Sequence, residues 1–592
     1  MCTHIPCKVW LVRSWQVLLV LVLLFWAWPP APARAAGHFT VNSFFDYNEI
    51  DHYLELREAL AIANGDLLGP FTNEEKAQLG GDCGFSGADD AWYISGGCGK
   101  DSPDTIVFSS GLGGIGGTIH LNPVMGVLPD ISEYYATSIT GPSASGAEIA
   151  IDGSDLFAGP LLTISSEYNG IFGHLAFINS PDIGLNITGN NNGVDEVRAY
   201  GNGSYGIQIS GDHNDVLYAE LGFRSLSNPT LCEENTDNAT SNIVLADGAE
   251  SNIIRNNTLV CSLGAGIWVT GATAASNTIA NNYVGVWNKG GSLRLLGNSI
   301  AGIAISAGSH DNTLNTNYIG GNGAGIALTG EGTDNNEIFN NYIGRVTLGN
   351  IPNNLSGIVI GLNAQSNQIH DNSIAMNAVA GVVIDDSIAN NTVVENNDIY
   401  GNTSHGVILR GATIGNTIRG NHIFNNSGAG IQIAGTAYGN LIETGSIHNN
   451  TGAGIVQEAS AGPNLWRTLS IYANGGLGID TLANGIPNGP YPTITGFEPA
   501  GGGGLAVKGT AELSTSVELY RVDPDPSGFG EGKTYLGNAP TDGTGHWSIT
   551  IPAGSLGTLT ALQAKSTEDG PDASEFGPNV TWFNVYLPLI MR

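Results

Sequence analysis

A glycine followed by isoleucine or valine recurs about every 24 residues through the centre of this chain. The last five intervals between these glycines are 24 or 25 residues long. A fixed period of this length is typical of solenoids, in which each coil buries its apolar side only by stacking on the next coil. The glycines are Gly302, Gly325, Gly357, Gly381, Gly406, Gly430, Gly454 and Gly478.

Three columns of asparagine keep step with the glycines. Because successive side chains of a strand alternate between two faces, an asparagine and the apolar residue two positions later lie on the same face. We therefore predict three short strands per coil, a core of stacked isoleucine and valine, and inward asparagine amides that hydrogen-bond from coil to coil. The columns are Asn367, Asn391, Asn416, Asn440; Asn372, Asn397, Asn421; and Asn377, Asn402, Asn426, Asn450. The first column's apolar partners are Ile369, Val393, Ile418 and Ile442.

The predicted fold class is all-β, a right-handed parallel β-helix with three sheets and about 24 residues per coil. The composition agrees, because 85 glycines and only 12% charged residues are unfavourable for helical bundles. The formal net charge of −33 repels nucleic acid and anionic membranes, so we expect neither as a partner.

The amino terminus has the features of a Sec-type signal peptide. Lys8 and Arg13 precede an apolar run from Val17 to Trp28, and small residues then offer a cleavage site near Ala35. The apolar run is shorter than the ~20 residues that span a bilayer. We therefore expect a mature chain without a transmembrane segment, secreted or at the cell surface, and monomeric.

The cysteines that follow the signal peptide are Cys83, Cys98, Cys232 and Cys261. In an oxidising compartment they are expected to form disulfides, and four cysteines allow three pairings. Proximity along the chain favours Cys83–Cys98 and Cys232–Cys261.

A different pattern begins at Tyr491. Alternating strands at Leu505–Val507, Val517–Leu519, Trp547–Ile551 and Leu559–Ala564 predict an antiparallel sandwich of immunoglobulin type. One of its loops places oxygen ligands at Asp523, Asp525, Ser527 and Glu531, a candidate Ca²⁺ site. A solvated hairpin loop is the alternative, and no other cofactor is expected.

The chain resembles the secreted bacterial right-handed parallel β-helix proteins that open with a CSLREA-type module. The module's helix corresponds to Leu56–Asn64, and segments such as Asp104–Phe108 and Gly117–Leu121 follow in the family's order. Leu54 and Glu55 stand where the family has its leading cysteine, so Cys83 and Cys98 are candidates for a replacement disulfide. The resemblance implies a pectin-lyase-like fold, which hosts polysaccharide lyases, hydrolases and epimerases as well as proteins without assigned activity.

One cluster resembles a catalytic motif. Asp385 and Asp386 precede His405, as the paired acids precede a His-Gly motif in β-helical polygalacturonases. The other motifs of those enzymes are missing. The period gives a simpler interpretation, because Asp385 lies four residues after one repeat glycine and Arg410 four after the next, which predicts an outward ion pair.

The same arithmetic pairs Arg419 with Glu443 and Asp398 with His422. A polysaccharide lyase needs a basic residue beside carboxylates. Lys289 is the only lysine between Lys100 and Lys508, and it lies in an insertion.

We therefore expect a non-enzymatic protein for adhesion or binding of an extracellular polysaccharide or surface glycan. The alternative is a polysaccharide lyase or glycoside hydrolase of the pectin-lyase-like fold. Binding is expected where the period breaks, at Gly285–Leu296, Arg345–Asn354 and Cys232–Cys261. The expected domains are a signal peptide (1–35), a CSLREA-like module with the first rungs (36–155), the β-helix (156–490), the sandwich (491–582) and a tail (583–592).

Overall fold

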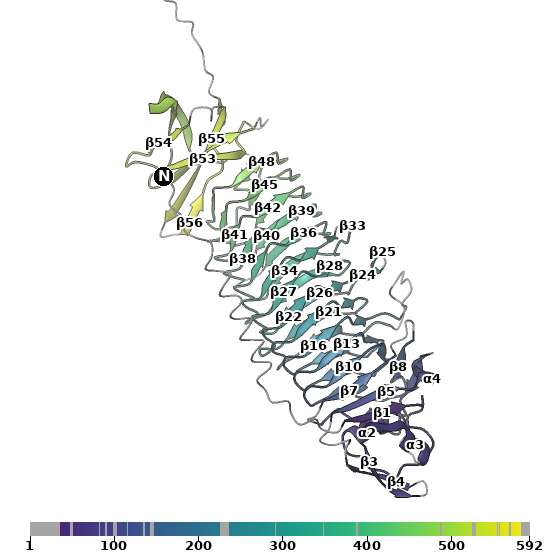
Figure 1. The fold of residues 1–592 in the computed structure, drawn as a ribbon. Coiled ribbons are helices and arrows are strands. Elements are labelled where there is room, and N and C mark those ends of the chain that lie inside the picture. The colour runs from purple at the N-terminus through teal and green to yellow at the C-terminus, as the bar shows by residue number, and fades with distance from the viewer. Residues whose placement is uncertain are drawn as a thin grey trace, which may run out of the picture.

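A computed structural model shows a long right-handed parallel β-helix that ends in a β-sandwich (Figure 1). A small module with helices and a hairpin covers the other end. The described residues are 36–581 without 48–50, 82, 89–90, 97, 99–102, 115, 134–135, 143–146, 225–231, 233–235, 290–291, 347–348, 386–388, 486–487, 524–527, 553–554, 556 and 568–569.

Three parallel sheets form the sides of the β-helix, with 16, 14 and 13 strands. The 16-stranded sheet runs from β2 (Leu79–Gly81) and β1 (Gly37–Val41) to β47 (Leu465–Arg467). The 13-stranded sheet runs from β9 (Leu162–Ile164) to β49 (Ile479–Asp480). From β9 onward, each coil contributes one strand to each sheet, as the periodicity predicts.

The 14-stranded sheet carries most of the features discussed below. Its strands, in order, are β6 (Gly117–His120), β8 (Ile149–Asp152), β11 (Leu175–Ile178), β14 (Arg198–Tyr200), β17 (Glu220–Leu221), β20 (Thr258–Leu259), β23 (Tyr283–Val284), β28 (Tyr318–Ile319), β31 (Tyr342–Ile343), β36 (Ser373–Ala375), β39 (Asp398–Tyr400), β42 (His422–Phe424), β45 (Ser446–His448) and β48 (Ser470–Tyr472).

The asparagine ladders are buried, as predicted. In most rungs the asparagine side-chain oxygen accepts hydrogen bonds from the backbone and side-chain nitrogens of the asparagine one coil earlier, for example from Asn397 to Asn421 at 2.9 and 3.0 Å. The ladders also extend toward the amino terminus, through residues such as Asn277, Asn282 and Asn298. Because most rungs complete the hydrogen bonding of their neighbours, most of the polar corners are buried with their hydrogen bonds made.

One rung was assigned incorrectly from the sequence. Asn391 is exposed and lies in a left-handed turn with φ 54°, and Thr392 occupies the inward position instead. The coil after Asn367 has 25 residues rather than 24, as the in-register pair of Gln368 and Val393 shows. The inward apolar residue of this coil is accordingly Val394, and not Val393.

Both predicted interruptions of the period are hairpins that project from the β-helix (Figure 1). The first pairs β24 (Val286–Lys289) with β25 (Ser292–Leu295) in antiparallel register. The second pairs β32 (Arg345–Val346) with β33 (Gly349–Asn350). Trp287 and Leu296 of the first hairpin pack on Phe223 and Cys261, which fixes its base against the coils.

The module at the amino-terminal end contains α2 (Leu56–Ala63), α3 (Asn73–Gln78), α4 (Ser110–Gly113) and the hairpin of β3 (Gly84–Ala88) and β4 (Ala91–Gly96). Arg57 of α2 forms a buried ion pair with Asp46 at 2.7 Å and donates to the carbonyl of Val127. A buried pair is favourable only when its remaining hydrogen bonds are also made, and here they are. The predicted disulfide Cys83–Cys98 closes the same module.

The sandwich consists of a three-stranded sheet, β50 (Thr493–Pro499), β51 (Leu505–Thr510) and β54 (His546–Ile551), and a five-stranded sheet. The second sheet contains β53 (Gly532–Pro540), β52 (Ser516–Val522), β55 (Thr558–Thr567), β56 (Gly570–Ala573) and β57 (Val580–Thr581). The four predicted strand segments all lie in these strands, and their apolar residues form a separate core.

Three buried glutamates of the sandwich close the carboxyl-terminal end of the β-helix. They accept hydrogen bonds from backbone N–H groups that a further coil would otherwise pair. The bonds run from Thr468 to Glu518 (2.8 Å), from Asn474 to Glu531 (2.9 Å) and from Thr481 to Glu575 (2.7 Å). Among the described residues, no helix has the length and apolar character needed to cross a bilayer.

Candidate functional site

The residues that resemble a hydrolase motif do not form one site. Asp385 pairs with Arg410 on the adjacent strand at 2.7 Å, which confirms the predicted outward ion pair. His405 is turned away, and its Nδ1 accepts a hydrogen bond from the backbone N–H of Ala429 at 2.9 Å. Burial lowers the pKa of His405, so the neutral ring that accepts this bond is favoured. Asp386 lies outside the described residues.

Of the two other predicted cross-coil pairs, one forms and one does not. Asp398 lies 3.3 Å from Nδ1 of His422, as expected. Arg419, however, pairs with Glu395 on the preceding coil at 2.6 Å, although it is also in register with Glu443 on the following coil. Acidic and basic residues alternate along this column, so Arg419 has two candidate partners, and Glu443 pairs instead with Arg467 on the last strand.

The candidate Ca²⁺ ligands have other partners where they are described. Asp523 pairs with Lys533 at 2.5 Å, and Glu531 accepts from the backbone and side-chain nitrogens of Asn474. Glu531 thus stands where the side chain of the next ladder asparagine would be. Asp525 and Ser527 lie outside the described residues, and the Ca²⁺ site stays a prediction.

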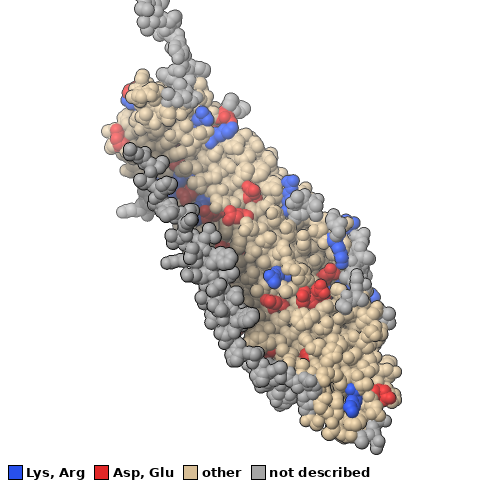
Figure 2. All heavy atoms as spheres, viewed as in Figure 1, with Lys and Arg blue, Asp and Glu red and all other residues tan. Residues whose placement is uncertain are grey.

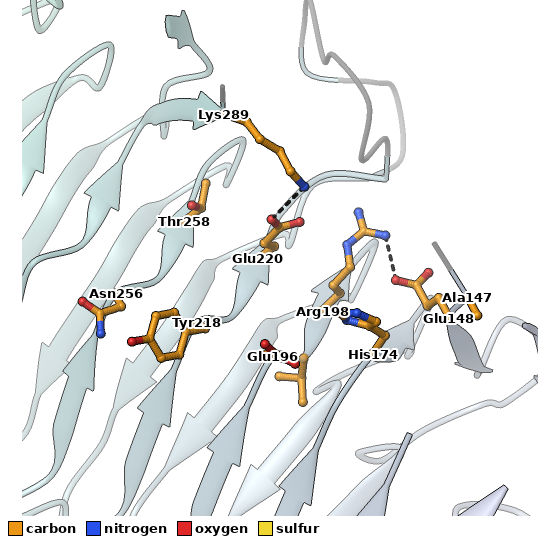
Figure 3. A pocket seen from close by; sticks show the side chains of 11 residues that line it. Ala147, Glu148, His174, Glu196, Arg198, Tyr218, Glu220, Asn256, Thr258 and Lys289 are labelled. Atoms are coloured by element: carbon orange, nitrogen blue, oxygen red, sulfur yellow. Dashed lines mark hydrogen bonds and ion pairs between the residues drawn. The ribbon is translucent and has the colours of Figure 1, made fainter. Parts of the chain in front are cut away.

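A groove of about 350 Å³ lies on the outer face of the 14-stranded sheet, beside the first hairpin (Figure 3). Its volume falls within the ~300–1,000 Å³ that is usual for ligand sites. Strands β14, β17 and β20 form its floor, and Lys289 reaches into it from the hairpin. Arg198, Glu220 and Thr258 occupy one column of the floor, because they are in register on successive strands. The remaining lining residues include Glu148, His174, Glu196, Tyr218 and Asn256.

Two ion pairs neutralise most of the charge in the groove. Arg198 pairs with Glu148 at 2.9 Å, and Lys289 lies 3.8 Å from Glu220 (Figure 3). A second contact also fixes Arg198. Its side chain is buried and donates a hydrogen bond to the backbone carbonyl of Phe223. Glu196 is exposed and leaves the groove with one excess negative charge when His174 is neutral.

Two groove side chains project from tight turns. Glu196 and Tyr218 lie between the 16-stranded and 14-stranded sheets in left-handed conformation, with φ 56° and 50°. Most coils have a residue of this kind at the same corner, so the conformation belongs to the fold and is no sign of catalytic strain. It directs the ring of Tyr218 outward, where 56% of the residue is exposed.

A row of tyrosines continues the floor column of the groove. Tyr283 follows Thr258 in register, and Tyr318 and Tyr342 follow on the next coils. Their rings stack on one another with centroids 4.8 and 5.2 Å apart. Stacking uses both faces of Tyr318 and one face of each neighbour, so the middle of the row presents ring edges and hydroxyl groups to solvent.

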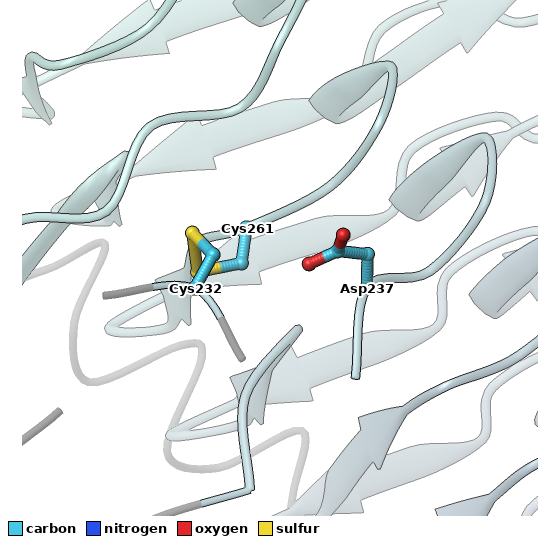
Figure 4. Close-up of side chains that lie close together, drawn as sticks. All are labelled: Cys232, Asp237 and Cys261. Atoms are coloured by element: carbon cyan, nitrogen blue, oxygen red, sulfur yellow. A yellow bond between two sulfur atoms is a disulfide. The ribbon is translucent and has the colours of Figure 1, made fainter. Parts of the chain in front are cut away.

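The Cys232–Cys261 stretch contains a second cluster of polar groups (Figure 4). Cys232 and Cys261 form the predicted disulfide, and the carboxylate of Asp237 lies close to the two sulfurs. This is the only group of three histidine, cysteine or acidic side chains within metal-binding distance among the described residues. A disulfide offers no thiolate, so the cluster lacks the ligands that would hold a soft metal ion.

Sequence reasoning pointed to the first hairpin but missed the groove itself. Lys289 stands out in the sequence only as the one lysine between Lys100 and Lys508, and nothing in the sequence connects it with Arg198. The groove could have been found from the sequence by placing the outward residues of successive coils in register. This requires the irregular early coils to be aligned as well as the regular later ones. Those coils have unequal lengths, since 22 residues separate Arg198 from Glu220 and 38 separate Glu220 from Thr258.

No curated protein matches the chain in sequence. Solved structures with similar folds include the periplasmic alginate epimerase AlgG, at 15% identity and a TM-score of 0.35, with 62% of this chain and 84% of that chain covered. The A-module of the Azotobacter vinelandii mannuronan C-5 epimerase AlgE4 has 14% identity and a TM-score of 0.30, covering 67% and 91%. The Dettilon tailspike protein has 14% identity and a TM-score of 0.32, covering 80% and 88%. Likeness at this level identifies no site residue.

A family match covers more than half of the chain. Residues 148–348 and 343–474, which include the groove and most of the β-helix, match the family described as periplasmic copper-binding protein (NosD). The chain is therefore a member of the NosD family.

Proposed function

We propose that this protein binds an uncharged extracytoplasmic glycan in the groove beside the first hairpin and does not cleave it. The observation that carries the proposal is the composition of the groove. Tyr218, Asn256 and Thr258 offer an aromatic ring, an amide and a hydroxyl group around a neutralised ionic floor. Sugar rings are bound by this combination of hydrogen-bonding groups and an apolar surface.

The basic residues of the groove favour binding over catalysis. A lyase needs a basic group that accepts a proton and a second group that stabilises the resulting anion. Arg198 is held by Glu148 and by a backbone carbonyl, and Lys289 lies against Glu220. Each of the two cations is paired with a carboxylate. Both therefore contribute to the shape and polarity of the groove surface and are not free to act as a base.

The charges of the surface favour an uncharged ligand. The groove has three glutamates against one arginine and one lysine, and the whole chain has a formal net charge of −33. An anionic polysaccharide would be repelled by both. Figure 2 shows charged side chains only in small separate groups on an otherwise uncharged face of the β-helix. The tyrosine row beyond the groove would extend the contact by its hydroxyl groups.

The location of the protein is part of the same proposal. The family description is periplasmic, and the disulfides require an oxidising compartment. We infer an extracytoplasmic protein, exported by the signal peptide and released or held at the cell surface, with a CSLREA-type module at its amino-terminal end. Copper, which the family description names, does not fit the Cys232–Cys261 cluster for the reason given above.

The test is a binding and cleavage assay on a panel of neutral and acidic polysaccharides. We expect retention of a neutral polysaccharide without release of reducing ends or unsaturated products. Tyr218→Ala is expected to weaken binding at least tenfold. Tyr438→Ala removes another exposed tyrosine, 46% exposed, from a distant coil and should leave binding unchanged. Product release that Glu220→Gln abolishes would instead identify an enzyme, and equal effects of both tyrosine variants would exclude the groove as the binding site.

A further inference from the structure

Two histidines meet on the outer face of the 14-stranded sheet, three and four strands beyond β31, where the tyrosine row ends. The Nε2 atoms of His422 and His448 are 2.8 Å apart. His422 in β42 is in register with Ser446, whereas His448 in β45 is in register with Phe424. The ring of His422 therefore reaches diagonally across the strands, toward the histidine of the next coil.

The ring of His448 is held by an aromatic stack. It lies between Phe424 and Tyr472, with centroid distances of 5.4 and 4.6 Å and interplanar angles of 15°. Tyr400 continues the stack behind Phe424 at 4.8 Å. A ring fixed in this way presents its Nε2 in one direction, so little side-chain entropy remains to be lost when a ligand binds there.

The ring of His422 is oriented by a carboxylate. Its Nδ1 faces Asp398 at 3.3 Å, and Nε2 points the other way, toward His448. This arrangement of carboxylate, histidine and open nitrogen is the usual one behind metal-binding histidines, because the carboxylate fixes the tautomer and increases the basicity of the ring.

The protonation pattern of the pair follows from its surroundings. Nδ1 of His448 is buried and hydrogen bonds to none of the described residues. Nδ1 of His422 faces a carboxylate and carries the proton that it donates. The remaining hydrogen bond is then donated by Nε2 of His448 to Nε2 of His422.

We propose that His422 and His448 bind one Cu²⁺ ion through their Nε2 atoms, with solvent in the remaining positions. Two nitrogens at about 2.0–2.1 Å from one ion and at a right angle to each other are about 2.9 Å apart, close to the spacing in the pair. Cu²⁺ favours imidazole nitrogens and right-angled tetragonal coordination, and it binds such sites more tightly than the other divalent metals of the first row. Both histidines lie within the segment 343–474 that matches the family described as copper-binding.

Binding moves the proton on Nε2 of His448 to Nδ1 or to solvent. Because Nδ1 of this ring lacks an acceptor among the described residues, the site should be weaker than one with a carboxylate behind each histidine. We therefore expect an exchangeable site, accessible from solvent, since 44% of the His422 side chain is exposed.

The test is a titration of the purified protein with Cu²⁺ against a competing chelator, with electron paramagnetic resonance of the bound ion as a second readout. All proteins should carry His38→Ala, because cleavage after Ala35 would place His38 third from a free amino terminus, where amine and imidazole can chelate Cu²⁺. The variants are His422→Ala and His448→Phe, which keeps the aromatic stack. His370→Ala is the matched control, since His370 also stacks on an aromatic ring and contacts carboxylates but lies outside the pair.

We expect at least a tenfold loss of Cu²⁺ affinity in His422→Ala and His448→Phe, together with loss of the signal from two coordinated nitrogens. His370→Ala should bind as the parent does, and thermal unfolding should show all variants to be folded. The proposal is overturned if the parent gives no two-nitrogen signal, or if the three variants weaken binding equally.

Discussion

Asn402 is the position at which the ladder model can be tested most directly. Its Oδ1 accepts from the backbone N–H and the side-chain nitrogen of Asn377, both at 3.0 Å. Its own amide nitrogen donates to Asn426 and to the carbonyl of Ile374. Asn402→Ala removes this acceptor and both donor bonds from a position with no exposed surface.

The cost follows from the groups that lose their partners. Asn377 is itself fully buried, and no other acceptor for its two nitrogens is found among the described residues. Each buried donor without a partner costs roughly 1–3 kcal/mol, so we expect the coil to lose roughly 2–6 kcal/mol of stability. At about 1.4 kcal/mol for each factor of ten, the population of the opened coil should rise at least about 25-fold.

Hydrogen exchange of the backbone amides around Asn377 measures this opening locally, which avoids assuming that a long repeat protein unfolds in one step. The matched control is Asn391→Gly, which removes an exposed asparagine side chain from the neighbouring turn. Because glycine adopts the left-handed conformation at φ 54° without strain, stability should change by no more than about 0.5 kcal/mol. Equal protection in the two variants would refute the assignment of the ladder as a main source of coil stability.

Three further predictions concern the ends and edges of the β-helix. Glu531→Ala should loosen the sandwich by roughly 1–3 kcal/mol, because the N–H of Asn474 loses its acceptor, whereas Glu531→Gln keeps an acceptor and should resist limited proteolysis like the parent. Reduction of Cys232–Cys261, which closes a separation of 29 residues, should cost roughly 3–4 kcal/mol in chemical denaturation, and the Cys232→Ser/Cys261→Ser variant should not respond to reductant. The lowered pKa of His405 stabilises the fold above its ordinary value of 6.5. That contribution is lost as pH falls below 6.5, so acid should lower the melting temperature less in His405→Gln than in the parent.

The regular part of the fold was predictable because its determinants are local and repeat. Inward asparagine and apolar residues recur at a fixed spacing, and the spacing alone defines the coil, its three strands and the cross-coil pair of Asp385 and Arg410. The predicted ladder is wrong where the spacing changes by one residue. A ladder with period 24 selects Asn391 as the inward residue. The coil has 25 residues and places Thr392 at the inward position, so an assignment by residue type gives the wrong register.

The groove was not predictable for a related reason. Its residues come from coils of unequal length and from a hairpin, so no single period brings Arg198, Glu220 and Lys289 together. The role of the glutamates that close the carboxyl-terminal end of the β-helix was also not predictable from the sequence. Glu531, for example, lies in a loop whose alternating oxygen atoms resemble a Ca²⁺ site. Only the position of the sandwich on the last coil reveals that this carboxylate replaces the next asparagine of the ladder.

The outward columns of the 14-stranded sheet explain how one scaffold can carry two unrelated sites. Inward positions are constrained by the ladder and by the core, so substitutions there are costly in every coil. Outward positions are constrained only by their neighbours one coil above and below, as the change along one column from Glu220 to Tyr318 and then to His422 shows. The groove floor and His422 share this column, and His448 lies on the adjacent outward column of Phe424, so the two sites can arise on one sheet without affecting each other. Loss of glycan binding in Tyr218→Ala should accordingly leave Cu²⁺ binding unchanged, and His448→Phe should leave glycan binding unchanged.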